Sequence, residues 1–145
     1  MNSRRYRYLD CTKVVRLAEY YKAERKVVVY AGSVEDITRF RSLNPRITIL
    51  GFIANVREIK KFLAAGADTI RLWPRCIRLR PAFVSTVHEL GKPVWTTAGL
   101  AGREELKQLI QFGVDGVLTD LPHVLMALVA DIRAGRRPRK GPVKK

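Results

Sequence analysis

The sequence predicts an α/β protein in which six parallel strands alternate with helices. Short apolar segments recur at a step of roughly 21 to 24 residues, and a segment of helical period follows each of them. A helix between two strands returns the chain to the edge at which the first strand began, so the strands lie parallel. The predicted strands are residues 6–11, 27–31, 47–53, 69–73, 93–97 and 116–119.

The helices are marked by their ends and by their apolar stripes. Ser33 with Asp36, and Asn55 with Glu58, form capping-box patterns that predict two helix starts. Pro81 predicts another start, and the glycines at 66, 91 and 113 predict helix ends. Apolar stripes predict the other helices: Val14, Leu17, Ala18 and Tyr21 in the first; Leu106, Leu109 and Ile110 in the fifth; Leu125, Leu128, Val129 and Ile132 in the sixth.

Two segments, 62–70 and 109–117, are nearly copies of one another and start 47 residues apart. Each holds the end of a helix, a glycine, an aspartate (Asp68 or Asp115) and the start of a strand. The separation equals two strand–helix units, so we interpret the repeat as architectural.

Six strand–helix units fit either an open doubly wound sheet or part of an eight-stranded barrel. Dinucleotide-binding and P-loop proteins are excluded, because each strand is followed by at most one glycine, as at Gly32 and Gly99. A leucine-rich solenoid is excluded because the strands lack its leucine ladder. A complete barrel needs about 250 residues. The 145 residues of this chain would hold six of eight units.

The composition, 47% hydrophobic and 28% charged, is typical of a soluble globular protein. No apolar run approaches the roughly 18 residues of a membrane helix, and no secretory signal follows Met1. Cys11 and Cys76 show no metal-ligand spacing and predict a reducing, cytoplasmic setting.

Most of the net charge of +15 comes from the chain ends. Ten of the 28 Lys and Arg lie in residues 4–7 and 133–145, which leaves 18 cations against 13 acids elsewhere. Glycines and prolines among the last cations predict a disordered basic tail, 135–145, after a domain spanning 1–134. We interpret the tail as a solvated end rather than a nucleic-acid binder, because no aromatic residue lies among its cations.

The most specific motif lies between Val87 and Pro122, in two blocks separated by one helix. The blocks hold Gly91, Val94, Trp95 and Thr96, then Gly113, Val114, Asp115, Gly116, Thr119, Asp120 and Pro122. They resemble the C-terminal end of the glycerophosphodiester phosphodiesterase family, with its W-T-V-N and G-V-D-G-I-I-T-D-x-P patterns. Thr97 and Ala98 stand where the family usually has Val and Asn.

The resemblance extends more weakly over nearly the whole chain and implies the family's third to eighth strands. The implied fold is an incomplete (β/α)8 TIM-type barrel with six parallel strands in consecutive order. Strands 6–11 and 116–119 would then lie at open edges, unpaired with each other, which predicts a homodimer, an aggregate or a complementing segment across them.

A metal site is implied by the same resemblance. In the family, the strand that corresponds to residues 6–11 carries a glutamate that ligates a metal, and Asp10 occupies that place. Mg²⁺ or Ca²⁺ is implied, since both prefer oxygen ligands. Aspartate reaches less far than glutamate, and Thr12 stands where the family has lysine. The alternative is that Asp10 caps the following helix.

Three further residues are candidates for substrate binding. Trp95 and Trp73 are expected to end strands and face the barrel mouth, where a ring can stack on an alcohol moiety. Trp73 alternatively packs under the turn at Pro74. Lys13 is a candidate partner of a phosphate oxygen, or else a solvated residue of a helix start.

The family's catalytic motifs are missing from the sequence. Its chemistry uses a His-Arg pair, a Glu-x-Asp pair and a second histidine, whereas the only histidines here are His88 and His123. We interpret His88 as a packing residue on a helix, while His123 follows the last strand and lies nearer the mouth. No catalytic residue is assigned.

The resemblance implies a phosphoric diester hydrolase of lipid and glycerol metabolism. Such an enzyme cleaves a glycerophosphodiester to glycerol phosphate and an alcohol with the help of a divalent metal. Because the catalytic motifs are missing, we expect a truncated or degenerate form that is inactive alone. The alternative is a non-catalytic barrel domain that binds a phosphate ligand or a partner. Nucleic acid is not an expected partner.

Overall fold

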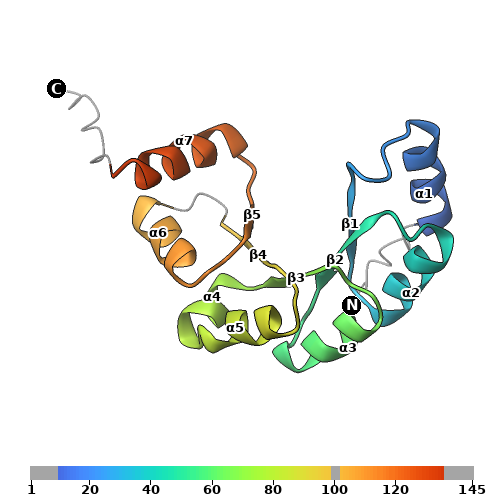
Figure 1. Cartoon of the computed structure of the whole chain (residues 1–145), viewed down its shortest axis with the longest axis horizontal. Helices are drawn as coiled ribbons and strands as arrows, with labels where there is room; N and C mark the ends of the chain where they lie inside the picture. Colours follow the sequence, from blue (N-terminus) through green and yellow to red (C-terminus); the bar gives the residue numbers. More distant parts are fainter. Residues whose placement is uncertain (1–9, 99–101, 136–145) are drawn as a thin grey trace, which may run out of the picture.

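Five parallel strands form one curled sheet in the computed structural model, which describes residues 10–98 and 102–135 (Figure 1). The order is β1-β2-β3-β4-β5, so neighbours in sequence are neighbours in the sheet. The strands are β1 (Val28–Ala31), β2 (Thr48–Phe52), β3 (Thr69–Leu72), β4 (Val94–Thr97) and β5 (Gly116–Leu118). The predicted order and direction are confirmed for these five strands.

The first predicted strand, 6–11, lies outside the described residues except for its last two. There the prediction is wrong, because Asp10 is the N-cap of a helix that begins at Cys11. Within the described residues β1 and β5 are the edges of the sheet, and they are not paired with each other. The predicted tail, 135–145, lies outside the described residues except for Gly135.

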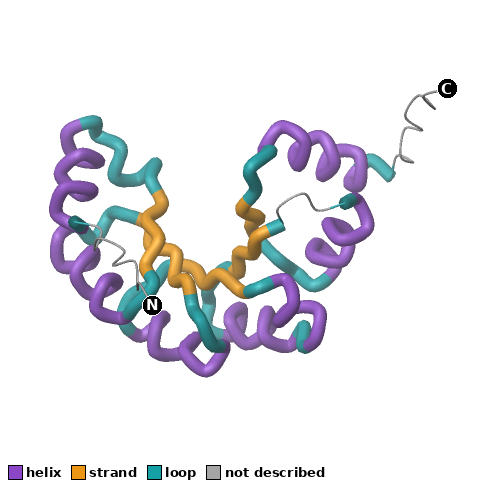
Figure 2. Tube along the Cα trace, turned by 180° about the vertical axis from the view of Figure 1, so that it is seen from behind, coloured by secondary structure: helices purple, strands orange, loops and turns teal. Residues whose placement is uncertain are grey.

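The helices lie on the convex side of the curled sheet, and the strands line the inside of the arc (Figure 2). They are α1 (Cys11–Tyr20), α2 (Val34–Leu43), the short 3₁₀ helix η1 (Val56–Glu58), α3 (Ile59–Ala64), α4 (Pro74–Leu79), α5 (Ala82–Glu89), α6 (Arg103–Gln111) and α7 (Pro122–Arg133). The whole is an incomplete TIM-type α/β fold, as predicted. None of these helices is long and apolar enough to cross a membrane.

The predicted helix ends form as expected. Ser33 accepts a hydrogen bond from the Asp36 backbone N–H, and Asn55 with Glu58 forms a complete capping box. Gly66 follows α3 with a φ of +107°, a left-handed conformation that glycine adopts without steric cost. Helix α4 was not predicted, because its six residues are too few to show a period and only Ile77 among them is buried.

The buried face of α1 differs from the predicted one. Cys11, Val15 and Ala18 face the core, while Leu17 and Tyr21 are 60% and 70% exposed. Both faces contain apolar residues at helical spacing. Helix α1 packs on α2 through the face of Cys11, so the stripe through Leu17 turns to solvent. Ile110 of the predicted α6 stripe is also exposed.

The core lies between the convex face of the sheet and the helices. Val29 lies opposite Ile49, and Ile70 opposite Val94, in the registers of neighbouring strands. All four are buried in one cluster with Phe40 of α2 and residues of the other helices. Alternate residues of each strand therefore face the helices, and the residues between them face the inside of the arc.

The sequence repeat is confirmed as architectural. Asp68 Oδ2 accepts the Ile49 N–H at 2.8 Å, and Asp115 Oδ2 accepts the Val94 N–H at the same distance. Each aspartate thus joins the start of its own strand to the preceding strand. Each also pairs with a side chain of the helix before that preceding strand: Arg41 of α2 for Asp68, and His88 of α5 for Asp115. Arg41 and His88 are themselves 47 residues apart.

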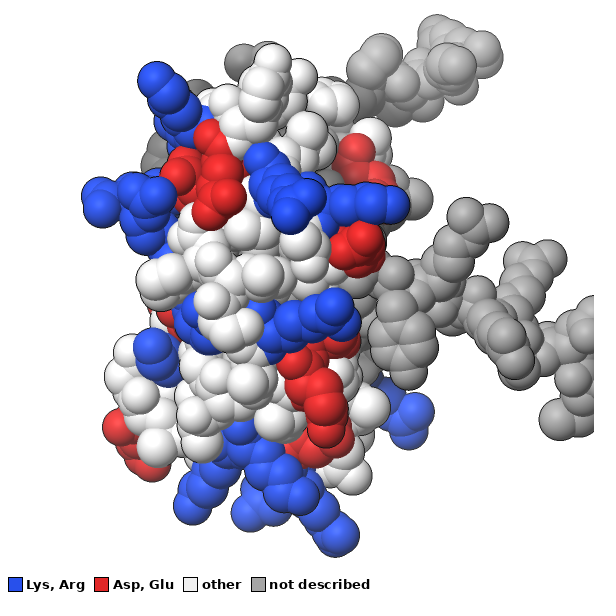
Figure 3. Space-filling view, turned by 90° about the vertical axis from the view of Figure 1, so that its right-hand side faces the viewer, with Lys and Arg blue, Asp and Glu red and all other residues white. Residues whose placement is uncertain are grey.

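Charged side chains on the surface are mixed in sign. On the face drawn in Figure 3, Lys and Arg lie interspersed with Asp and Glu rather than forming one basic surface. Arg46 Nη2 and Glu24 Oε1, for example, are 2.8 Å apart. This mixture agrees with the small excess of cations outside the chain ends.

Candidate functional site

The inside of the arc, called here the concave face, is the candidate functional surface. It is lined by the strand residues that do not face the helices: Val28, Tyr30, Leu50, Phe52, Arg71, Trp73, Trp95 and Thr97. Tyr30 is 55% exposed, although it lies in a strand. Barrel enzymes place their sites at the carboxyl ends of the strands, which is where Phe52 and Trp73 lie.

Arg71 is the central residue of this face. It is the third residue of β3 and only 2% exposed. Its Cζ atom lies 3.2 Å from the ring centroid of Trp73 and 4.1 Å from that of Phe52. Phe52 and Trp73 meet edge to face with centroids 5.8 Å apart, and Tyr30 meets Phe52 in the same way at 4.7 Å. A buried cation is therefore enclosed by aromatic rings.

Thr97 of β4 holds one edge of the guanidinium. Arg71 Nε and Nη2 donate to Thr97 Oγ1 at 3.1 and 2.9 Å, whereas Nη1 is buried and has no hydrogen-bond partner. Burial lowers the pKa of Arg71 from its ordinary value, but an arginine stays protonated at neutral pH. Within the described residues, no carboxylate forms an ion pair with it.

Arg71 was not among the predicted site residues. The available signal was a charged residue in the middle of the otherwise uncharged strand segment Thr69-Ile70-Arg71-Leu72-Trp73. Such a residue is rare in a buried strand unless it is paired. Its partners could not be predicted, since Thr97 is 26 residues away in sequence.

The two tryptophans occupy different positions. Trp73 directly follows β3, as predicted, and is 45% exposed. Trp95 is not at a strand end, because it is the second residue of β4, which continues to Thr97. Its ring lies over Gly116. A Cβ atom at position 116 would lie only 2.8 Å from three atoms of the ring. The absence of a side chain at Gly116 therefore lets Trp95 pack flat along the concave face.

Asp10 and Lys13 lie together at the start of α1. Asp10 Oδ1 accepts the Lys13 backbone N–H at 3.4 Å, and Lys13 Nζ lies 3.7 Å from Asp10 Oδ2. Asp10 thus acts as a helix cap here, and the Lys13 side chain is largely in solvent. Their roles in metal and phosphate binding stay predictions.

The described residues do not fit Mg²⁺ or Ca²⁺ by themselves. In residues 10–98 and 102–135 no group of three or more His, Cys, Asp or Glu side chains could hold a metal. The Asp10 carboxylate, which pairs with the Lys13 ammonium, offers too few oxygen ligands for either ion.

The histidines lie apart from Arg71 and its rings. His88 Nε2 is 2.8 Å from Asp115 Oδ2, at the amino end of β5 and therefore away from the carboxyl ends of the strands. His123 is exposed on the first turn of α7. The structure does not bring the two histidines together with Asp10 in a metal-binding group.

Comparison with known proteins finds similar structures but no matching sequence family. No family model matches the chain, and no curated protein matches it. Solved structures do match, among them a glycerophosphoryl diester phosphodiesterase from Parabacteroides distasonis, with a TM-score of 0.71 and 14% identity over 86% of this chain and 48% of that chain. A glycerophosphodiester phosphodiesterase from Agrobacterium tumefaciens matches with a TM-score of 0.68 and 20% identity. The match covers 83% of this chain and 52% of that chain.

At these identities the likeness shows the fold alone. The chain spans about half the length of the solved structures that it matches. It therefore has the fold of part of a glycerophosphodiester phosphodiesterase barrel, as the sequence resemblance implied.

Proposed function

We propose that this chain is the ligand-binding part of a glycerophosphodiester phosphodiesterase-type hydrolase, in a truncated or degenerate form that does not turn over substrate alone. The observation that carries the proposal is the concave face, with Trp73, Phe52 and Tyr30 around Arg71 at the carboxyl ends of the strands. Aromatic rings beside a cation suit a ligand with an apolar part and an anionic part. The fold supports a hydrolase of this kind.

Catalysis in this proposal requires groups that the described residues do not supply. Mg²⁺ or Ca²⁺ would be held mainly by carboxylates from a complementing segment, with Asp10 as one further ligand. When bound, the ion would neutralise charge on the phosphate group. The role of the described residues would be to bind the diester and to orient it along the concave face.

The complementation itself provides the test. The chain is co-expressed with a polypeptide that carries the family's His-Arg and Glu-x-Asp strands, and hydrolysis of a glycerophosphodiester is followed with Mg²⁺ or Ca²⁺. We expect metal-dependent turnover only when both parts are present. No turnover from a pair that co-purifies would contradict the proposal.

A non-catalytic domain that binds a phosphate ligand is the second candidate. It is favoured by the engagement of Asp10 with the Lys13 ammonium and the α1 backbone. The transcript upstream of Met1 distinguishes the two: in-frame His-Arg and Glu-x-Asp codons support the hydrolase, and their absence supports the binding domain. A reducing, cytoplasmic setting is part of either proposal.

We expect Trp95→Ala to weaken binding of glycerol 3-phosphate about two- to tenfold while changing the melting temperature little. Binding weakens because the substitution removes the contact between the ring and the ligand. The melting temperature changes little because one side of the ring borders the open concave face rather than the core. Calorimetric titration and thermal melting measure the two effects. Tyr21→Ala, at an exposed aromatic residue that caps the end of α1, is the control. A lowered melting temperature with unchanged affinity would show that Trp95 only packs.

We expect the chain to form dimers or larger assemblies through its open edges. The exposed Val28 and Tyr30 of the edge strand β1 support this, because unpaired strand edges and apolar side chains favour association. Light scattering over a concentration series measures the mass. Val28→Lys should shift the distribution toward the monomer, whereas Leu17→Lys on α1 should not. A stable monomer at high concentration would refute this expectation.

A further inference from the structure

The Arg71 guanidinium is a buried cation whose hydrogen bonds are incomplete. Of its five N–H groups, two are directed to Thr97 Oγ1, and neither N–H of Nη1 has a partner. Among the described residues no carboxylate balances its charge. Buried charges in folded proteins are normally paired and hydrogen-bonded. An acceptor for Nη1 is thus the missing part of this arrangement.

The geometry shows which edge of the guanidinium is available. Nε and Nη2 form one edge of the group, and Thr97 occupies it. The remaining edge is formed by Nη1 and the second N–H of Nη2, which point in parallel. Two parallel N–H donors match two oxygen atoms of a phosphate or carboxylate. Thr97 therefore positions Arg71, and Nη1, on the edge whose shape suits bidentate contact with an anion, has no acceptor.

Trp73 stacks on the Arg71 guanidinium and is an exposed group among those that contact it. The centroids of Trp73 and Phe52 are 3.2 and 4.1 Å from Arg71 Cζ but only 5.8 Å from each other, so the rings do not lie on opposite sides of it. Trp73 is 45% exposed, and its solvent side leaves room for another rotamer. Phe52 is held between the rings of Tyr30 and Trp73.

We propose that Arg71 is the anchor of an oxyanion receptor that binds the phosphate group of a small phosphate ester, and that Trp73 moves aside to admit it. The phosphate supplies the acceptors that Nη1 lacks and balances the buried charge. The aromatic rings of Trp73 and Tyr30 then contact the organic part of the ester. This inference rests on the proposed function only in taking the concave face as the ligand-binding face.

The test measures binding of phenyl phosphate and inorganic phosphate at constant ionic strength. Trp95→Phe leaves Trp73 as the sole tryptophan, so a saturable change in its emission reports movement of the Trp73 ring. Calorimetric titration of the unmodified chain checks the affinity independently. We expect both phosphates to bind, and Arg71→Met to weaken binding at least tenfold without lowering the melting temperature, because it removes an unpaired buried charge.

Two control variants separate a local effect from loss of charge or of fold. Arg16→Met removes one positive charge from the outside of α1 and should leave phosphate affinity unchanged. Arg41→Met breaks the pair with Asp68 and should lower the melting temperature, with phosphate affinity kept at a temperature where the variant is folded.

Three results would overturn the inference. They are the absence of saturable binding, equal binding by Arg71→Met, and equal affinity for benzoate, which would exclude selection for phosphate. Turnover by the complemented chain without phosphate binding at Arg71 would refute the inference and leave the proposed function intact. Binding at Arg71 without any turnover after complementation would refute the hydrolase and leave the receptor.

Discussion

The isolated chain, supplied with Mg²⁺ or Ca²⁺ and a glycerophosphodiester, is expected to turn over substrate at least about 10²–10⁴-fold more slowly than a complete enzyme of this type. Positioned proton transfer contributes a factor of this size, and the histidine pair that would perform it is missing. His88 is engaged with Asp115, and His123 lies exposed on α7. An incomplete metal site would reduce the rate further.

The measurement is release of the alcohol from the diester by purified chain, with a chelator-treated sample as the blank. Asp10→Ala is the informative variant. If the chain turned over substrate at the rate of a complete enzyme and lost that activity on Asp10→Ala, the proposal of an inactive form would be wrong. Unchanged background hydrolysis in both samples is the expected result.

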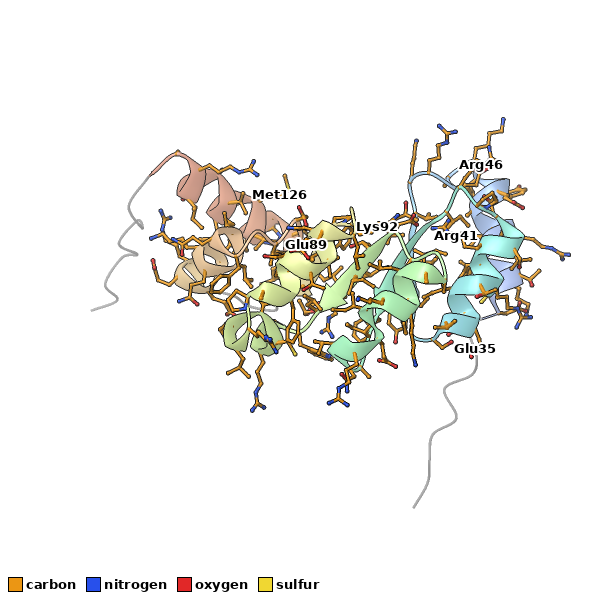
Figure 4. The ribbon with its side chains drawn as sticks, turned by 60° about the horizontal axis from the view of Figure 1, so that its bottom comes forward. Glu35, Arg41, Arg46, Glu89, Lys92 and Met126 are labelled. Atoms are coloured by element: carbon orange, nitrogen blue, oxygen red, sulfur yellow. The ribbon has the colours of Figure 1, made fainter. Side chains whose placement is uncertain are left out.

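Replacing Asp68 by alanine is expected to lower the free energy of unfolding by about 2–4 kcal/mol. Asp68 accepts the Ile49 N–H and pairs with Arg41 of α2, whose position is marked in Figure 4. Arg41 also donates to the carbonyl oxygens of Gly66 and Ile47, each at 2.9 Å. Removing the carboxylate leaves the Ile49 N–H and Arg41 Nη2 without this acceptor and leaves the guanidinium without its counter-charge.

Asp115→Ala is the matched comparison, because Asp115 occupies the same place in the repeat. It accepts the Val94 N–H but pairs with a histidine rather than with an arginine that bridges several carbonyl groups. We expect a smaller loss, about 1–2 kcal/mol. Urea unfolding followed by circular dichroism measures both variants. A loss from Asp115→Ala equal to or larger than that from Asp68→Ala would contradict this ranking.

The positions of the strands and of most helix ends follow from local sequence. Apolar segments at a regular step located β1 to β5 to within one residue at each end. Gly66 and the Asn55–Glu58 capping box act within one turn of the chain, so their conformations can be predicted from neighbouring residues. The consecutive order of the strands was implied by the family resemblance, since strand–helix units alone also fit a doubly wound sheet.

The candidate site depended on contacts between residues far apart in sequence. Arg71 meets Phe52 and Thr97 because the register of three strands places them side by side, and no local pattern contains that register. The error at Trp95 was of another kind, because the predicted strand 93–97 already placed this residue in mid-strand, as in β4.

The sequence by itself determined the positions of β1 to β5 and of most helix ends, and it determined the 47-residue repeat. Tertiary structure decided the face that α1 buries, since two apolar faces were available and packing on α2 selects one. It also decided that Asp10 caps a helix and that His88 supports Asp115. The enclosure of Arg71 by aromatic rings was also decided at this level. The burial of a strand residue and the partners of its side chain depend on the neighbouring strands rather than on neighbours along the chain.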